Sequence, residues 1–198
     1  ILDYTQIKRS IENGDYQPVY FLQGENTYYI DEIANKLINC VLEENKKDFN
    51  QTILYGKDSS ADQVIDHAKR YPVMSDYQLI VVREAQHLSR TIDKFESYFK
   101  NPVLTTILVF CFKGKKIDKR KSVGKLLSKN KFLFDAEPIK DYQLPDWVAN
   151  NAKINGLRID QKASVLIAEF LGNDLAAINK NINKLKLLTD LNDVVNTE

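Results

Sequence analysis

The chain has 198 residues, of which 43% are hydrophobic and 28% charged, and its formal net charge is +1. This composition is ordinary for a globular protein of one or two domains, and the balanced charge excludes a general attraction to nucleic acid or acidic membranes. No apolar run approaches the roughly 18 residues of a membrane span, and the N-terminus lacks a signal-peptide pattern. Cys40 and Cys111 both lie in apolar segments, which is typical of buried thiols rather than a disulfide and favours a reducing cytoplasm.

Strands and helices are predicted to alternate through the first two thirds of the chain. Apolar residues recur at helical spacing in residues 4–13, 28–42, 61–71 and 92–99. Strands are predicted over residues 18–22, 49–55, 79–82, 105–112 and 132–134. The run LIVV at 79–82 is continuously apolar, which is typical of a strand buried on both faces of a parallel sheet. The alternation predicts an α/β domain in three layers, with helices covering a parallel sheet.

The sequence changes character at Pro138. Helices are predicted over residues 145–155, 161–171 and 174–188, and no strand is predicted from Lys140 onward. We therefore predict an α/β domain over residues 1–138, followed by a small helical domain over residues 139–198.

The first turn between a strand and a helix, GENTYYID at 24–31, lies where phosphate-binding loops occur in α/β proteins. Compared with the pattern GxxxxGK[ST], only Gly24 matches. Tyr29 replaces the second glycine, Ile30 the lysine, and Asp31 the hydroxyl that binds magnesium. A phosphate cradle needs small residues and a cation, whereas this turn has two tyrosines and acidic side chains. We therefore predict a degenerate phosphate loop and no nucleotide cofactor.

The residue that would hold magnesium is also replaced. In an active ATPase of this kind an aspartate ends the strand that corresponds to 79–82, and here Arg83 takes that place. Glu84 follows, but without a metal ion it is best interpreted as a solvated charge. His67 and His87 lack a neighbouring cysteine and the spacing of metal ligands, so no metal site is predicted.

Residues 72–78 are predicted to form a short loop at the entrance to strand 79–82. Pro72 excludes a helix interior, and Val73 and Met74 stand between it and the polar pair SD at 75–76. An apolar pair in this position either fills the protein's own core or docks on another protein. The residues alone leave both interpretations open.

Positive charge is concentrated in residues 113–131. This segment contains nine basic residues and one acidic residue, Asp118, so it carries a net charge of +8 and the remainder of the chain −7. Such segregation is typical of proteins that contact a phosphate backbone along one edge. The candidate contacts, to DNA or to neighbouring subunits, are Lys113, Lys115, Lys116, Lys119, Arg120, Lys121 and Lys125. Few aromatic residues interleave with them and no base-reading motif occurs, so a solvated surface is an equally good interpretation.

Several stretches together resemble the delta subunit family of bacterial DNA polymerase III, which belongs to the clamp loader. In the first domain the resemblance rests on PVYFLQGE at 18–25 with Asp31 and Glu32, PVMS at 72–75, and IDKRK at 117–121 with Lys125. In the second domain it rests on LPDW at 144–147, NGL at 155–157, GNDL at 172–175 and NINKL at 181–185. The series extends over nearly the whole chain.

The resemblance implies a fold, a role and partners. The fold would be an AAA+ module of the P-loop NTPase type without a working nucleotide site, followed by a lid domain. The family's collar domain would follow Glu198, which makes the chain an N-terminal fragment. The role would be that of a non-catalytic component of the polymerase holoenzyme that binds and helps open the sliding clamp, the beta subunit, in the cytoplasm. The gamma/tau and delta-prime subunits and primed DNA would be further partners.

The resemblance also implies a contact site. The clamp would be bound by Val73 and Met74, next to Pro72. Many family members carry an aromatic residue in this pair, whereas both residues here are aliphatic. Two hypotheses from other classes remain open: an ATPase with an atypical nucleotide site, and a nucleic-acid-binding adaptor that works through residues 113–131.

Overall fold

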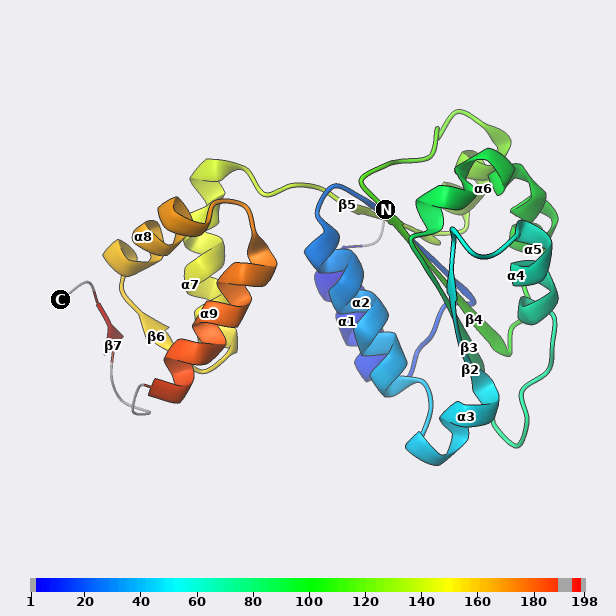
Figure 1. The fold of residues 1–198 in the computed structure, drawn as a ribbon, viewed down its shortest axis with the longest axis horizontal. Coiled ribbons are helices and arrows are strands. Elements are labelled where there is room, and N and C mark those ends of the chain that lie inside the picture. Colours follow the sequence, from blue (N-terminus) through cyan, green and yellow to red (C-terminus); the bar gives the residue numbers. More distant parts are fainter. Residues whose placement is uncertain (1–2, 189–193, 197–198) are drawn as a thin grey trace. The chain divides into compact units, whose positions relative to one another are not determined.

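The computed structural model describes residues 3–188 and 194–196. The chain divides into two compact units, Ile1–Glu137 and Pro138–Glu198 (Figure 1). The first unit contains a five-stranded sheet, and the second is built mainly of helices. Each unit is described by itself.

The sheet of the first unit is parallel throughout, as predicted. Its strands are β1 (Val19–Gly24), β2 (Gln51–Tyr55), β3 (Gln78–Arg83), β4 (Thr106–Lys113) and β5 (Leu133–Ala136). They lie in the order β2-β3-β4-β1-β5. β3, β4 and β1 are the interior strands, and the apolar run of residues 79–82 is buried on both faces as expected.

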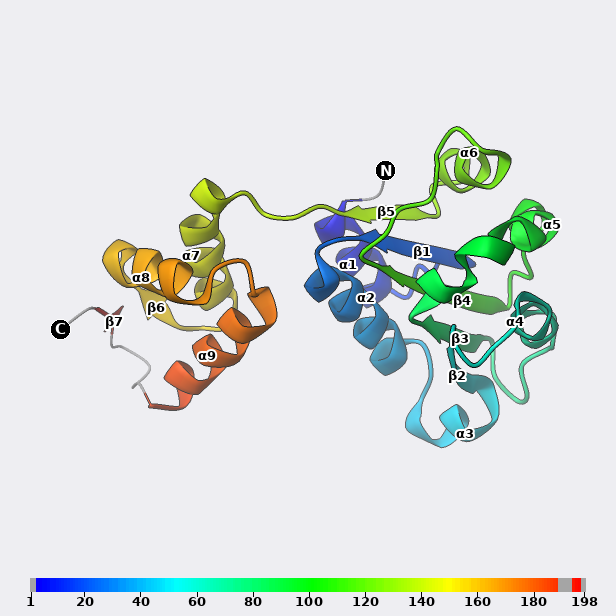
Figure 2. The ribbon, with the colours of Figure 1, turned by 45° about the horizontal axis from the view of Figure 1, so that its top comes forward.

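Helices cover both faces of this sheet (Figure 2). On one face lie α1 (Tyr4–Glu12) and α2 (Thr27–Cys40), and on the other lie α4 (Ala61–Ala68), the 3-10 helix η2 (Ala85–Phe95), α5 (Glu96–Lys100) and α6 (Ser122–Lys129). Successive side chains of β1 point to opposite faces. Tyr20 and Leu22 therefore pack in the core under α1 and α2, and Val19 and Phe21 pack in the core under η2 and α5.

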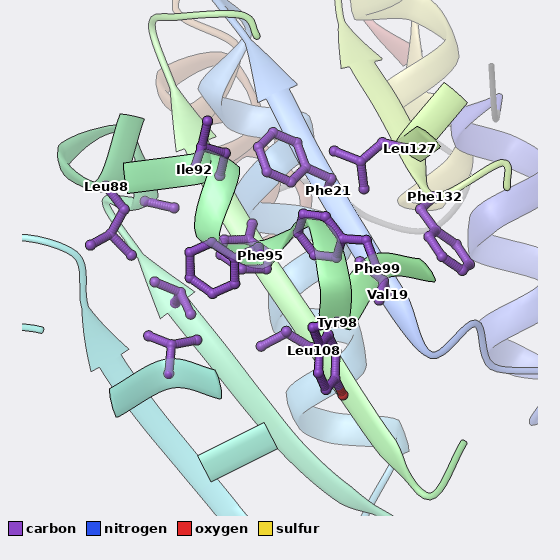
Figure 3. Packing of buried hydrophobic residues seen from close by; sticks show 14 of the residues in the cluster. Val19, Phe21, Leu88, Ile92, Phe95, Tyr98, Phe99, Leu108, Leu127 and Phe132 are labelled. Atoms are coloured by element: carbon purple, nitrogen blue, oxygen red, sulfur yellow. The ribbon is translucent and has the colours of Figure 1, made fainter. Parts of the chain in front are cut away.

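Aromatic rings fill the core beneath η2 and α5. Phe21 stacks on Phe110 with ring centroids 5.3 Å apart. Phe99 packs edge-on against both rings, and Phe95 packs edge-on against Phe110. Figure 3 shows Phe21, Phe95 and Phe99 in this cluster. All four side chains are fully buried. Because such aromatic contacts add to the free energy gained from area burial, this cluster fixes the helical layer firmly on the sheet.

Several predicted boundaries in the first unit were wrong. The segment at 49–55 is not all strand, because Lys47–Asn50 forms the short helix α3 before β2 begins. α4 ends at Ala68 rather than at residue 71, and the helix predicted over 92–99 is a long 3-10 helix followed by the short α5. Cys111 is buried as expected, but Cys40 is exposed, and both thiols are free.

The second unit contains η3 (Asp141–Gln143), α7 (Leu144–Ile154), α8 (Gln161–Leu171) and α9 (Leu175–Leu188). The predicted helical region is therefore confirmed, and Asp160 caps α8 by accepting a hydrogen bond from the Ala163 N–H at 2.6 Å. The expectation that no strand follows Lys140 was wrong at four residues. β6 (Arg158–Ile159) and β7 (Val194–Val195) pair in parallel, an arrangement too short to leave a periodic signal. Among the described residues, no helix is long and apolar enough to span a membrane.

Candidate functional site

The turn that corresponds to a phosphate loop is too short to form a cradle. β1 ends at Gly24 and α2 begins at Thr27, so only two residues connect them. Tyr29 and Ile30 consequently lie inside the helix, and Ile30 is fully buried in the core where a phosphate-binding lysine would be exposed. The N–H of Asn26 donates to the carbonyl oxygen of Ala136 at 3.1 Å and is not available to a ligand.

Gly24 is required by packing against β5 rather than by phosphate binding. Its φ is +128°, a conformation that side chains rarely adopt, and a Cβ atom there would lie far inside van der Waals contact with the backbone of Ala136. The match of this glycine to the phosphate-loop pattern therefore has a structural explanation.

Asp31 and Arg83, two residues that replace parts of a nucleotide site, form an ion pair. Arg83 Nη1 donates to Asp31 Oδ1 at 3.1 Å, and Arg83 Nη2 donates to Asn35 Oδ1 at 2.8 Å. The second carboxylate oxygen of Asp31 accepts a hydrogen bond from Lys113 Nζ at 2.6 Å. One carboxylate from α2 is therefore shared by two cations at the carboxyl ends of β3 and β4, where an ATPase would hold magnesium and phosphate.

The loop between α4 and β3 presents its apolar pair to solvent. Val73 is 53% exposed and Met74 93% exposed, while Pro72 is partly buried. Met74 has a φ of +50°, in the left-handed region that is unfavourable for a residue with a side chain. The interpretation that these side chains fill the protein's own core is therefore wrong. The other interpretation, docking on a partner, remains.

Buried polar side chains from three elements anchor this loop. At its start, Gln78 Nε2 donates to the carbonyl oxygen of Arg70, and Thr106 Oγ1 donates to that of Ala68 at 2.9 Å. In its middle, Asn50 forms hydrogen bonds with both the N–H and the carbonyl oxygen of Val73. The sequence analysis missed these anchors, and Asn50 lay in a segment predicted as strand. An isolated asparagine carries no sequence signal for a partner 23 residues away.

The basic segment is ordered and partly neutralised. Lys113 pairs with Asp31, Lys116 with Glu137, Lys119 with Asp135, and Arg120 with Asp118. Among the lysines of residues 113–131, five have no ion-pair partner in the described part of the chain: Lys115, Lys121, Lys125, Lys129 and Lys131. The last four lie on or beside α6. The free positive charge is therefore smaller than the sequence suggests and is centred on that helix.

Lys119 has a structural role through a nearly buried carboxylate. Asp135 lies on β5 with its side chain only 5% exposed, and it accepts hydrogen bonds from Lys119 Nζ and, at 2.6 Å, from Gln23 Nε2. Burial alone would raise the pKa of Asp135, but these two donors outweigh it and hold the pKa below its ordinary value. Gln23 also accepts the N–H of Ile117 at 2.8 Å, which ties the basic loop to β1.

Among the described residues, no group of three or more His, Cys, Asp or Glu side chains is placed to hold a metal ion.

Of the residues singled out in the sequence, the structure brings Asp31, Arg83 and Lys113 together at one end of the sheet. It places Val73 and Met74 at the entrance of β3, the opposite end of that strand.

Comparison with known proteins identifies the family of the chain. The family described as "DNA polymerase III, delta subunit" matches residues 20–137, which is more than half of the sequence. The DNA polymerase III subunit delta of Bacillus subtilis (strain 168) is 26% identical over 186 residues. That match includes 89% of this chain and 54% of the relative, so the chain spans about half the length of the curated relative.

Solved structures show the same fold. The Bacillus subtilis DNA clamp loader delta protein (YqeN) superposes with a TM-score of 0.80 and 24% identity, over 98% of this chain and 60% of that one. A DNA polymerase III gamma subunit-related protein from Thermotoga maritima superposes with a TM-score of 0.52 and 14% identity, over 93% of this chain and 60% of that one. The chain therefore has the same fold as these two proteins.

Proposed function

Because the chain belongs to the delta subunit family of DNA polymerase III, we propose that it binds the sliding clamp and helps to open it without hydrolysing ATP itself. The observation that carries this proposal is the exposed pair Val73 and Met74 on an anchored loop. The proposed partners are the ring-shaped clamp, the gamma/tau and delta-prime subunits of the loader, and primed DNA. A cytoplasmic location follows from this role.

The proposed contact is an insertion of apolar side chains into a pocket of the clamp. Full burial of an aliphatic side chain contributes about 1.5–3 kcal/mol before the cost of ordering the two partners. Single exposed apolar side chains are common on protein surfaces, so the proposed contact is inferred from two adjacent ones, Val73 and Met74, carried by a loop that buried polar side chains hold in place. Of the two side chains, Met74, at 93% exposed, would bury the larger share of its surface on binding. Its flexible thioether can adapt to the shape of a pocket.

A non-catalytic role is supported by the residues at the end of the sheet where an active relative would bind nucleotide. Ile30 is buried where a lysine would contact phosphate, and Arg83 occupies the position of a magnesium ligand. A nucleotide would also have to displace the ion pair between Asp31 and Lys113. Clamp binding by this chain would therefore require no ATP, and its release would depend on neighbouring subunits.

The test is a titration of the clamp with the wild-type chain and with a variant that carries both Val73→Ala and Met74→Ala. We expect binding to be lost while the thermal unfolding midpoint stays the same, because both side chains project into solvent. Phe170→Ala serves as the control, since Phe170 is 85% exposed on α8 and has no part in the proposal. Wild-type affinity in the double variant contradicts the proposed contact.

DNA binding through α6 is a second candidate function, favoured by the lysines without ion-pair partners. Each phosphate contact adds about 0.7–0.9 to the slope of log affinity against log salt concentration. Reversing Lys121 and Lys125 to glutamate is expected to weaken DNA binding and flatten that slope, without affecting clamp binding. An unchanged slope assigns these lysines to a solvated surface.

A further inference from the structure

Asn50, which lies 23 residues before Val73 in the sequence, holds the backbone of the exposed loop by hydrogen bonds. It is the last residue of α3, immediately before β2, and only 3% of it is exposed. Its Oδ1 accepts a hydrogen bond from the N–H of Val73 at 2.6 Å, and its Nδ2 donates to the carbonyl oxygen of Val73 at 3.0 Å. The same Nδ2 also donates to the carbonyl oxygen of Lys46 at 3.0 Å. Both amide hydrogens are therefore used.

This pair of hydrogen bonds fixes the peptide groups on both sides of Val73. The N–H belongs to the peptide before Val73 and the carbonyl to the peptide after it, so neither peptide can rotate without breaking a bond to Asn50. The next residue, Met74, is held at φ +50°. A residue other than glycine keeps such a conformation only where its surroundings impose it. The contacts of Asn50 with Val73 are such a constraint, one residue before the strained position.

We propose that Asn50 is a positioning residue that holds Val73 and Met74 in the conformation that docks on the clamp. This inference rests on the proposed function. A flexible loop would occupy the docking conformation only part of the time, and the apparent affinity would fall by that fraction. Asn50 removes this cost by ordering the loop before the clamp arrives. It touches the loop backbone and leaves both apolar side chains free.

The experiment compares the wild-type chain with Asn50→Ala and Asn50→Asp. The aspartate variant is isosteric and creates no cavity, but it loses both donated bonds and places a carboxylate against two carbonyl oxygens. Asn45→Ala is the control, since Asn45 is an exposed asparagine on the preceding 3-10 helix η1 (Glu44–Lys46). Clamp affinity is measured by calorimetry. Loop order is measured by hydrogen exchange of the Val73 amide and by the methyl resonance of Met74, the chain's only methionine.

We expect both Asn50 variants to bind the clamp about tenfold more weakly, the effect of losing one or two hydrogen bonds that order the loop. The Val73 amide should exchange faster and the Met74 methyl should become more mobile, while the Val81 amide in the core of β3 stays protected. The control should resemble the wild type in every measurement. A structural role alone would change the protection of Val81 together with that of Val73.

Two results overturn the inference. If the Val73 amide exchanges equally slowly in the wild type and in both Asn50 variants, Asn50 does not order the loop. If Val73 exchanges faster but clamp affinity is unchanged, loop order does not contribute to docking. In both cases the proposed function stands as long as the wild-type chain binds the clamp. A wild-type chain that fails to bind the clamp contradicts the proposed function itself, together with this inference.

Discussion

Arg83 Nη1 lies 3.1 Å from Asp31 Oδ1, and these two residues replace a magnesium ligand and a hydroxyl ligand of an active nucleotide site. They are 52 positions apart in the sequence, yet their charges balance each other, and Lys113 completes the network. The single carboxylate of Asp31 is therefore shared by two cations, and this ion-pair network occupies the end of the sheet where an active ATPase would bind magnesium and phosphate.

We predict that Asp31→Ala lowers the free energy of unfolding by about 0.5–1 kcal/mol, because Arg83 and Lys113 lose their shared partner. The effect is small since all three side chains are partly exposed and screened, and it should shrink further at high salt. Urea denaturation at two salt concentrations measures it. Asp58→Ala, at an exposed position outside the network, is the control.

The same network predicts that the wild-type chain shows no saturable binding of ATP with magnesium in a calorimetric titration. Asp31→Ala should not create such binding, because Ile30 remains buried at the position of the lysine. Saturable ATP binding by the wild-type chain would favour the hypothesis of an atypical ATPase.

Gly24→Ala is predicted to destabilise the first unit by more than about 2 kcal/mol. The added Cβ meets the backbone of Ala136, which cannot move without disturbing the pairing of β1 with β5. Gly14→Ala is a matched control, because Gly14 also has a positive φ but has no atom within 4 Å of an added Cβ. It should cost only about 1 kcal/mol. Equal costs in chemical denaturation would show that conformation, and not packing, requires Gly24.

Met74→Gly should separate stability from binding. Glycine accepts a φ of +50° without steric cost, so the free energy of unfolding should stay the same or rise by up to about 1 kcal/mol. Clamp affinity should nevertheless fall at least tenfold, because the most exposed apolar side chain is removed. Met74→Leu, which keeps the apolar volume, should bind nearly as well as the wild type. A stability loss on Met74→Gly would mean that the side chain has a structural role.

Lys119→Ala is predicted to lower the free energy of unfolding at neutral pH by about 1–2 kcal/mol, because a nearly buried carboxylate loses a charged donor. The pKa of Asp135 is depressed in the folded protein. Its stabilising contribution is therefore present above about pH 4, the ordinary value for an aspartate, and is lost as the pH falls through the folded pKa. Removing Lys119 should weaken this acid dependence.

Unfolding curves between pH 2 and 7 test this prediction, with Lys115→Ala as the control at an exposed lysine without an ion-pair partner. The control should leave both the stability and its pH dependence unchanged. Identical acid profiles for the wild type and Lys119→Ala would show that Lys119 does not lower the pKa of Asp135.

The layered architecture and the loss of the phosphate loop could be predicted from residue patterns along the chain. Continuous apolar runs such as residues 79–82 can be buried only in the interior of a helix-covered sheet, and the identities of Tyr29 and Ile30 are incompatible with a phosphate cradle whatever the tertiary structure. Burial patterns are local, so they can be read along the chain. The helix α3 was missed because four residues leave no periodicity, and η2 was predicted only at its end because a 3-10 helix does not follow the period of 3.6 residues.

The candidate sites, in contrast, depend on contacts between elements that are far apart in the sequence. The exposure of Val73 and Met74 was visible only in the folded chain, where Asn50, a residue from another element, forms hydrogen bonds with the Val73 backbone. Which lysines remain without partners depends on carboxylates that the fold brings from β5 and α2. Hydrogen bonds and ion pairs act over about 3 Å, and the sequence distances that they join, 23 residues for Asn50 and Val73, leave no repeating pattern. Such pairings become definite only when the sheet sets the order of its strands.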